Sequence, residues 1–281
     1  MSQKSYDGSN SLYLIPTPIG NLEDITLRSI NMLKKVDVIF CEDTRIAGML
    51  LNKLEIKKKL ISCNNINEEQ VKDKVLLQLQ NGLNVGLITD RGTPIISDPG
   101  YKSVDYVIKN GYNVIGLPGP TALIPALITS GIEPSPFLFY GFLNSKNSKL
   151  EKELEELVSL KYTLIFYESP HRILSMLTSL LKVFGDRKIS VNREISKLYE
   201  EIYRGKISEV IEEIPKDIKG EFVIVVEGNK ETPNYSNISI RDHVVSYVNL
   251  GYSEKEAMKL VARDRKMSKS DIYKEYVNGG I

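Results

Sequence analysis

The chain has 281 residues, with 37 basic and 36 acidic side chains, two cysteines, two histidines and no tryptophan. This length predicts about two domains, and a content of 42% hydrophobic and 26% charged residues excludes global disorder. The formal net charge of +1 excludes a protein that binds nucleic acid or an anionic membrane through bulk attraction. Any polyanionic partner must therefore be attracted by a local basic patch.

The cysteines and histidines are too few and too far apart for a metal site. Cys41 and Cys63 are not in a C-x-x-C motif, and His171 and His243 are distant from them in sequence. We expect two small buried thiols in a reducing cytosol, with neither a disulfide framework nor a metal. The chain lacks an apolar run long enough to span a bilayer, and its polar N-terminus lacks the apolar core of a signal peptide. These features predict a soluble, cytoplasmic protein that does not bind membranes.

The first half alternates short apolar runs with helical patterns. The predicted strands are Leu12–Ile15, Val36–Phe40, Asn84–Thr89 and Asn113–Leu117. One predicted helix begins at Thr26, and two further helices are predicted over Glu68–Asn81 and Tyr101–Asn110. This alternation predicts an α/β fold with a mostly parallel sheet that is covered on both faces.

The second half has more aromatic residues in its strands. Further strands are expected at Phe137–Phe142, Thr163–Tyr167, Lys188–Arg193, Ile195–Tyr203 and Glu221–Glu227, some of them antiparallel, with a helix over Ser148–Leu160. Residues 229–237 have the composition of a linker. Three short helices are predicted after it, over Ile240–Leu250, Ser253–Arg265 and Ser268–Tyr276.

Three loops combine Pro, Gly and polar residues directly after an apolar strand. They are Pro16–Asn21, Asp90–Gly100 and Pro118–Ala122. In α/β sheets ligands bind where the loops at the carboxyl ends of the strands converge. Glycine lets the backbone approach a ligand closely, and proline keeps such a loop rigid. Together the loops favour a flat, partly apolar ligand bound through backbone groups, although each loop alone could serve only to turn the chain.

Common nucleotide and hydrolase motifs are absent. The chain contains neither G-x-G-x-x-G nor G-x-x-x-x-G-K-[ST], and it lacks the G-x-S-x-G elbow. The three loops also contain no lysine, which argues against a triphosphate ligand.

Three further segments hold polar side chains near strand ends. Glu42–Arg45 could anchor phosphates or move a proton, or could be an ordinary acidic helix start. Tyr167–Arg172 places acid, imidazole and guanidinium groups within six residues, although its histidine could be purely structural. Arg193–Glu201 alternates charges and could equally be a solvated strand face.

Seven ordered motifs resemble one known family. They are LYLIPTPIGN at Leu12–Asn21, CEDTR at Cys41–Arg45, DRGTPIISDPG at Asp90–Gly100, LPGPTA at Leu117–Ala122, YESPHRI at Tyr167–Ile173, REISKLYEEIYRG at Arg193–Gly205 and KGEFVIVVEG at Lys219–Gly228. Together they resemble the ribosomal RNA small subunit methyltransferase I family of the tetrapyrrole methylase superfamily. The terminal helices are similar to that family's helix-turn-helix-like tail.

The resemblance implies a fold and an activity. The expected fold is α/β, with two α/β domains that contain mixed sheets, at residues 11–117 and 118–230, and a small helical tail at 236–281. The expected reaction transfers a methyl group from S-adenosyl-L-methionine to the 2′-hydroxyl of a cytidine in the decoding region of 16S rRNA. The expected partners are 16S rRNA within the 30S subunit and a second copy of the chain as a homodimer, without a metal.

The resemblance also implies site residues. Cofactor binding is expected from the three loops and from one strand end, at Pro18, Ile19, Gly20, Asp90, Arg91, Gly92, Thr93, Pro94, Ile96, Thr121, Ala122 and Tyr167. The catalytic candidates for proton handling are the carboxylates Glu42, Asp43 and Glu168. Contacts with RNA are expected from Arg45, His171, Arg172, Arg193 and Lys197.

The chain departs from the family pattern at three places, and two other functions stay open. Arg91 replaces a small residue, Asn64–Glu68 lacks a histidine, and Asn144 stands where a proline is common. A tetrapyrrole methylase would favour an uncharged, apolar cleft, whereas the predicted basic set favours RNA. A non-enzymatic RNA-binding scaffold would use the C-terminal helices, although residues 236–281 are only mildly basic.

Overall fold

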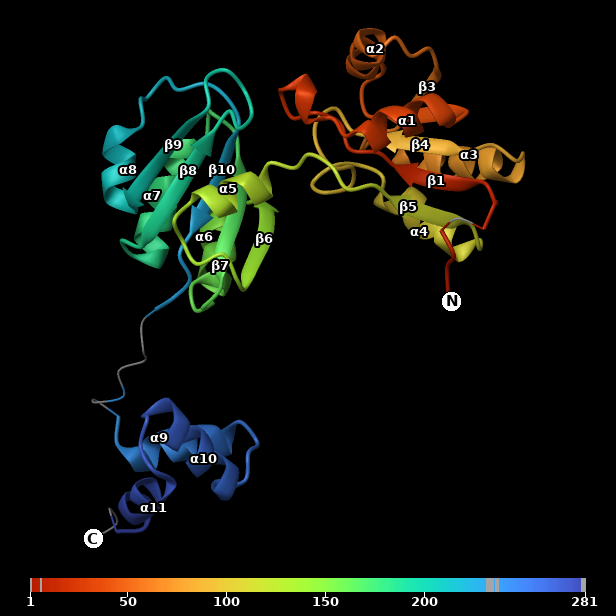
Figure 1. Ribbon diagram of the computed structural model, residues 1–281. Helices are drawn as coiled ribbons and strands as arrows, with labels where there is room; N and C mark the ends of the chain where they lie inside the picture. The colour runs from red at the N-terminus through yellow and green to blue at the C-terminus, as the bar shows by residue number, and fades with distance from the viewer. Residues whose placement is uncertain (1, 6, 231–234, 236–237, 279–281) are drawn as a thin grey trace. The chain divides into compact units, whose positions relative to one another are not determined.

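A computed structural model describes residues 2–5, 7–230, 235 and 238–278. The chain forms two compact units, Met1–Asn229 and Lys230–Ile281, and each is described by itself. The first unit contains both β-sheets, and the second contains three helices (Figure 1).

The first sheet is parallel throughout and has the order β3-β2-β4-β1-β5. Its strands are β1 (Ser11–Leu14), β2 (Val38–Cys41), β3 (Lys59–Ser62), β4 (Val85–Ile88) and β5 (Asn113–Gly116). The connecting helices are η1 (Leu22–Asp24), α1 (Leu27–Lys35), α2 (Thr44–Lys53), α3 (Glu68–Gln80) and α4 (Tyr101–Lys109).

Helices cover both faces of this sheet. The chain proceeds from β1 toward the β3 edge through α1 and α2 and then back toward the β5 edge through α3 and α4, which places the two pairs of helices on opposite faces. One core cluster joins Tyr13 and Ile39 to Leu33 and Leu51 of α1 and α2. A second cluster on the other face joins Leu12 and Phe40 to helices α3 and α4. β1 and β4 lie side by side at the centre, and their chains leave toward opposite edges. This is the switch point at which open α/β sheets bind ligands.

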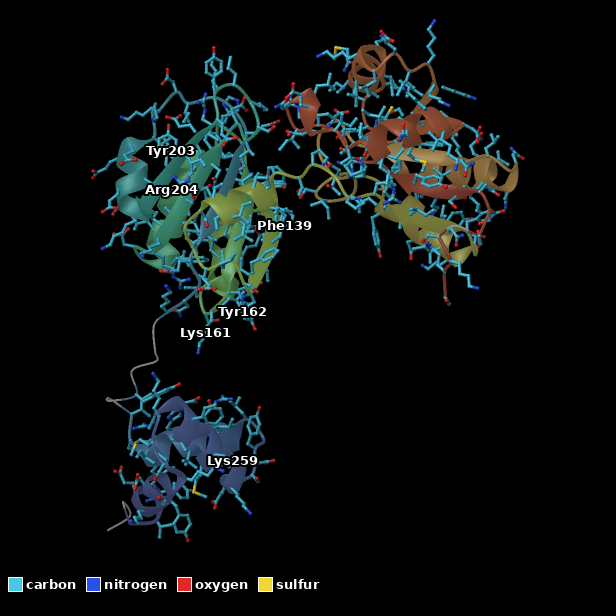
Figure 2. All side chains as sticks on the ribbon, in the orientation of Figure 1. Phe139, Lys161, Tyr162, Tyr203, Arg204 and Lys259 are labelled. Carbon is cyan, nitrogen blue, oxygen red and sulfur yellow. The ribbon has the colours of Figure 1, made fainter. Side chains whose placement is uncertain are left out.

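The second sheet is mixed and has the order β6-β7-β10-β8-β9. Its strands are β6 (Phe137–Phe142), β7 (Thr163–Glu168), β8 (Lys188–Arg193), β9 (Glu201–Lys206) and β10 (Phe222–Val226). The helices of this half are α5 (Leu123–Thr129), α6 (Asn147–Leu157), α7 (Ile173–Phe184) and α8 (Ile207–Glu213). Figure 2 shows Phe139 on β6 and both Tyr203 and Arg204 on β9, the two edge strands of this sheet.

The faces of the second sheet are covered unequally. Helices α6, α7 and α8 pack on one face around Phe166, Leu177 and Ile224. On the other face, α5 packs through Ala126 and Leu127.

Antiparallel pairing brings one end of three strands of the second sheet together. Only β6 and β7 are parallel, whereas β10 runs antiparallel to both β7 and β8. Phe222 at the start of β10 is therefore in register with Glu168 at the end of β7 and with Arg193 at the end of β8. Segments that are 25 or more residues apart in sequence meet at this end of the sheet.

The C-terminal unit consists of α9 (Ile240–Asn249), α10 (Glu254–Asp264) and α11 (Lys269–Asn278). Ser253 accepts a hydrogen bond from the amide of Glu256, whose carboxylate in turn accepts one from the Ser253 amide, so the predicted capping box is present. The core of the unit is formed by Ile240, Val244, Ala257, Val261, Ala262 and Ile272.

The α/β class and the C-terminal helices are confirmed, with three differences. The first sheet is purely parallel rather than mixed. The expected strand Ile195–Tyr203 is wrong at its start, because β9 begins only at Glu201. Residues 194–200 form a loop in which Glu194 and Ser196 have positive φ angles of 51° and 68°, which a strand does not allow. Helices α2, α5, α7 and α8 and strand β3 were not predicted.

The boundary at residue 117 between the two predicted α/β domains stays a prediction. Most of the predicted linker, 229–237, lies outside the described residues. In the described part of the chain, none of the helices is both long and apolar enough to cross a membrane.

Candidate functional site

The structure contains a cavity of about 540 Å³. It is lined by residues at the carboxyl ends of the parallel strands and by residues at one end of the mixed sheet. Its volume is in the range of small-molecule and cofactor sites. The first sheet and its loops contribute Ile19, Glu42, Ile46, Thr89, Asp90, Arg91, Gly92, Thr93, Ile96, Ser97, Asp98, Thr121 and Ala122. The second sheet contributes Phe142, Tyr167, Glu168, Ser169, Pro170, Ile195, Lys197, Glu221, Phe222 and Val223.

Hydrogen bonds join the three predicted loops into one frame. Thr17 and Gly92 exchange backbone hydrogen bonds of 2.9 and 3.1 Å. The Thr93 hydroxyl donates to the carbonyl of Pro120 at 2.9 Å. Gly92 has a φ of +86°, which favours glycine, and a Cβ on Gly119 would lie 2.5 Å from Cβ of Pro16. These glycines therefore allow the close loop contacts that form one wall of the cavity.

The loop at residues 90–100 is held in a strained conformation. Ile95 and Ser97 are not glycines, yet their φ angles are 77° and 68°. Such residues are costly and tend to occur at functional sites. The residue between them, Ile96, lines the cavity. The buried carboxylate of Glu68 holds the far end of the loop by accepting from the amide of Gly100 at 2.8 Å.

Three carboxylates of the first sheet gather on the cavity wall: Glu42, Asp90 and Asp98. The Thr89 hydroxyl lies 3.2 Å from Glu42 Oε2 and also forms a hydrogen bond with Asp98. The pKa of Asp98 is raised to about 6, mainly by burial; the hydrogen bond with Thr89 opposes this rise, and the charges of Glu42 and Asp90 add to it. Burial also raises the pKa of Asp90. Asp98 is therefore able to exchange a proton near neutral pH.

Asp43 has a different environment from its neighbours. Its side chain caps α2 by accepting from the amide of Arg45 at 2.8 Å, and it also forms an ion pair with the Arg45 guanidinium at 2.5 Å. Hydrogen bonds from Arg45 lower the pKa of Asp43 to about 2. Asp43 is not among the residues that line the cavity.

Aromatic rings and a buried carboxylate form the wall from the second sheet. The ring of Tyr167 lies edge-on to Phe142 with centroids 5.6 Å apart, and burial raises the pKa of its hydroxyl. Glu168 is 2% exposed, and its Oε1 accepts from the amide of Ser169 at 2.7 Å. Glu168 Oε2 has no hydrogen bond in the described structure, but Nη2 of Arg172 is 3.1 Å away as an ion-pair partner. Glu168 is thus held by its own strand end.

Charged side chains bridge the two sheets at the cavity. Arg91 forms an ion pair with one carboxylate oxygen of Glu221, and Lys197 lies 2.8 Å from the other oxygen. Lys197 also lies 2.8 Å from Glu194. A Cβ on Gly20 would lie 2.3 Å from Cγ of Lys197, so this lysine needs a glycine beneath it.

The structure brings most of the predicted cofactor residues together. Ile19, Asp90, Arg91, Gly92, Thr93, Ile96, Thr121, Ala122 and Tyr167 line the cavity, together with the catalytic candidates Glu42 and Glu168 and the RNA candidate Lys197. Pro18, Gly20 and Pro94 belong to the same loops but are not among the lining residues.

The remaining predicted RNA residues lie outside the cavity lining. Arg45 is on the surface with its side chain 87% exposed, and His171 is exposed. Arg172 donates to the carbonyls of Leu143 and Asn144, and Arg193 donates to that of Lys219.

Sequence reasoning missed several lining residues. Asp98 belongs to a loop that was singled out, and its carboxylate beside proline and glycine was a usable signal. Phe142 and Glu221 offered no such signal, because their place at the cavity depends on the pairing of strands that are far apart in sequence.

The lining is acidic overall and partly apolar. Among the described lining residues, the carboxylates are Glu42, Asp90, Asp98, Glu168 and Glu221, and the cations are Arg91 and Lys197. Isoleucine, valine and phenylalanine side chains form much of the rest. In the described part of the chain, no three His, Cys, Asp or Glu side chains are grouped to hold a metal ion. The cavity therefore favours a ligand that is partly apolar and has positive charge.

Comparisons with known proteins agree with this geometry. Residues 11–211 match the family "Tetrapyrrole (Corrin/Porphyrin) Methylases". A protein of Bacillus subtilis (strain 168) called ribosomal RNA small subunit methyltransferase I is 45% identical, over 98% of this chain and 97% of its own length. Proteins with the same name from Halalkalibacterium halodurans and Synechocystis are 43% and 38% identical, over 98% and 93% of this chain and 98% and 95% of their own lengths. The chain therefore belongs to the tetrapyrrole methylase family, as a methyltransferase homologous to ribosomal RNA small subunit methyltransferase I.

Proposed function

We propose that this protein transfers a methyl group from S-adenosyl-L-methionine to the ribose 2′-hydroxyl of a cytidine in the decoding region of 16S rRNA. The names of the relatives support a small-subunit rRNA substrate. The observation that most supports the chemistry is the cavity at the switch point of the parallel sheet, with Asp98 and Glu42 on its wall.

The residues present fit S-adenosyl-L-methionine. Its sulfonium and ammonium groups suit a lining with an excess of carboxylates, and its adenosine suits the isoleucines and the glycine-containing loops. Ile19, Gly92, Thr93, Ile96, Thr121 and Ala122 would hold it, together with Asp90 and Tyr167. When bound, this cofactor supplies an activated methyl group, so the protein needs only to align the acceptor and manage one proton.

Asp98 is the side chain best suited to accept the proton of the ribose hydroxyl. A general base works best when its pKa is near the working pH, and burial raises the pKa of Asp98 to about 6. Glu42, which shares the Thr89 hydroxyl with Asp98, would assist by keeping a negative charge nearby. Asp43, with its pKa lowered to about 2 and its carboxylate held by Arg45, is a weak base, and Glu168 is held by Arg172.

The exposed side chains near the cavity would contact the RNA. Arg45 and His171 have exposed side chains that can reach a large partner. Arg172 and Arg193 would instead support the site, since their guanidinium groups donate to carbonyls of the chain itself. We also expect a homodimer that acts on the 30S subunit in the cytoplasm, as the family resemblance implies.

The acidic lining argues against a tetrapyrrole substrate. Porphyrin precursors have several carboxylates around an apolar ring, and the cavity would repel them. A ribose hydroxyl is uncharged, so it can enter an acidic cavity without charge repulsion.

The test is methyl transfer from radiolabelled cofactor to three acceptors: 30S subunits, naked 16S rRNA and a porphyrin precursor. We expect label in 30S subunits, and nuclease mapping should recover it as 2′-O-methylcytidine from the decoding region. Label on a base or on the porphyrin ring would overturn the proposal. Calorimetry with S-adenosyl-L-methionine separates the enzyme from an RNA-binding scaffold, because a scaffold would show no heat of binding.

A further inference from the structure

One carboxylate at the cavity is held by two cations that come from different sheets. Arg91 follows β4 of the first sheet, whereas Lys197 lies in the loop between β8 and β9 of the second. Both contact the carboxylate of Glu221, Arg91 at Oε1 and Lys197 at Oε2, the latter at 2.8 Å. These are the cations among the described residues that line the cavity. The place between Arg91 and Lys197 thus holds one anionic group, the carboxylate of Glu221.

The parts of this place differ in how firmly they are held. Lys197 is 18% exposed, and its aliphatic stem lies over Gly20. Glu194 is 20% exposed, accepts from the amide of Glu221 at 3.0 Å and has its Cγ 2.6 Å from where a Cβ on Gly220 would be. The Glu221 side chain, in contrast, is 61% exposed. Its carboxylate can therefore move away while Lys197 and Glu194 stay in place.

The charge left behind matches one phosphodiester. Without the Glu221 side chain, Arg91, Lys197 and Glu194 together have a formal charge of +1. A phosphodiester has one negative charge, as Glu221 has, and an arginine can hold it through two parallel hydrogen bonds. Replacing Glu221 by a phosphate would therefore leave the total charge of the place unchanged.

We propose that Arg91 and Lys197 form a subsite for a backbone phosphate of the RNA substrate, which Glu221 occupies in the free enzyme and leaves when RNA binds. This inference rests on the proposed function for the identity of the RNA. It explains how a polyanion can approach a cavity that is acidic: two cations at the cavity are kept neutralised until a phosphate arrives. It also assigns a role to Arg91, one of the three places at which this chain departs from the family pattern.

The first experiment measures binding of unmethylated 30S subunits by full-length variants without turnover, with S-adenosylhomocysteine present. Glu221→Gln removes the internal competitor and should lower the Kd about 3–10-fold. Arg91→Gln and Lys197→Met should each raise the Kd by about the same factor and reduce the slope of log Kd against log salt by about 1. Met at position 197 keeps an aliphatic stem over Gly20.

Matched controls separate the subsite from general charge effects. Glu151 and Lys182 form an ion pair at 2.8 Å on α6 and α7 and do not line the cavity. Glu151→Gln and Lys182→Met change the net charge equally, and the Kd should stay within about twofold of the wild-type value. In an Arg91→Gln/Lys197→Met background, Glu221→Gln should lose its effect, because its two partners are gone.

Several outcomes would overturn the proposal. If Glu221→Gln weakens RNA binding and lowers the unfolding midpoint, the cluster is only a brace between the two sheets. If the variants change the calorimetric Kd of S-adenosyl-L-methionine and leave the Kd for RNA unchanged, the anion belongs to the cofactor. If Glu221→Gln and Glu151→Gln have equal effects, there is no specific subsite.

A second measurement keeps the subsite testable if the RNA assignment itself fails. If wild-type protein neither binds nor methylates 30S subunits, the proposed function is wrong. Inorganic phosphate then replaces the RNA, and line broadening of its ³¹P signal reports binding. Glu221→Gln should broaden this signal more than wild type does, and the Arg91→Gln/Lys197→Met double variant should abolish the effect. Equal broadening by all three proteins would overturn the subsite.

Discussion

The two sheets of the first unit contribute to the same cavity in different ways. In the parallel sheet, all strand-to-helix loops lie at the carboxyl ends of the strands. Residues that follow β1, β2, β4 and β5 therefore meet there. The mixed sheet has only part of its chain at the cavity: the ends of β6 and β7, the start of β10 and the loop after β8.

This difference separates two tasks. The first sheet supplies the carboxylates Glu42, Asp90 and Asp98, and the charges of Glu42 and Asp90 help to raise the pKa of Asp98. The second sheet supplies an aromatic wall and side chains that are held by local ion pairs, such as Glu168 with Arg172. We propose from this difference that the parallel sheet supplies the groups for the chemistry and that the mixed sheet shapes the site. Each of the following predictions can break or sharpen that proposal.

The largest effect is expected at Asp98 of the first sheet. Asp98→Asn should lower kcat by about 100-fold or more, since general-base catalysis contributes about 10²–10⁴-fold. The wild-type rate should fall as the pH drops below about 6, because a protonated Asp98 cannot accept the ribose proton. Single-turnover methylation across pH 5–8 measures both, and Asp105→Asn on α4 is the control, because Asp105 pairs only with Lys109 among the ion pairs described. A normal rate in Asp98→Asn would show that Asp98 is not the general base.

The next effect is on the stability of the second sheet. A Cβ on Gly228 would lie 2.3 Å from the carbonyl oxygen of Lys161, in the loop where Figure 2 labels Lys161 and Tyr162. Because backbone cannot yield as a flexible side chain can, Gly228→Ala should lower the free energy of unfolding by about 1–3 kcal/mol in urea titrations. Gly116→Ala in β5, where a Cβ would meet nothing within 4 Å, should change it by less than about 0.5 kcal/mol. Equal losses in both variants would contradict the steric reason.

A moderate effect is expected in the C-terminal unit, which has its own buried polar cluster. His243 is 5% exposed, its ring stacks on Tyr235 with centroids 4.0 Å apart, and its Nδ1 accepts from Arg265 at 3.2 Å. Burial and the charge of Arg265 lower the pKa of His243 below its usual 6.5, although Asp264 opposes them. The unfolded chain then binds the proton more readily, so this unit should lose stability as the pH falls below 6.5.

Imidazole NMR can follow this titration directly, because the chain has only two histidines. His171→Gln assigns the signals without touching the cluster. A pKa at or above 6.5 for His243 would contradict the expected shift. A matching change in the methylation rate would show that the C-terminal unit is coupled to the site of the first unit.

The smallest effect is expected at the two cysteine thiols, which lie at the first sheet and should not react with a thiol reagent in the native protein. Burial raises the pKa of Cys41, at the end of β2, to about 12 and that of Cys63, directly after β3, to about 11. Neither thiol should react with Ellman's reagent at pH 8 in the native protein, since the thiolate is the reactive form. In urea, thiol exposure therefore reports on the first sheet alone. If it coincides with the loss of circular dichroism, the two sheets unfold together, and if it comes earlier, they are independent.

Much of the first sheet could be predicted from the sequence. Strands such as β2 are continuous apolar runs (Val38–Cys41), and three loops of the sheet show proline and glycine directly afterwards, so local pattern identifies both. Asp98 was missed as a site residue although its loop was recognised and its carboxylate stands beside proline and glycine; what the sequence does not show is the strained backbone at Ile95 and Ser97. The second sheet was harder, since the loop at 194–200 has the alternating charges of a strand but left-handed residues at Glu194 and Ser196.

The sequence by itself determined the α/β class, the family and the loops that line the cavity, because these depend on residue patterns within short segments. Only the tertiary structure decided which charges meet. Phe222 lies opposite Glu168 and Arg193 through antiparallel pairing, and Glu221 beside it reaches Arg91 from the other sheet. The near balance of 37 basic and 36 acidic residues therefore does not describe the cavity, where five carboxylates meet two cations among the described lining residues and both cations contact Glu221. Such contacts depend on distances in space, which spacing along the chain does not contain.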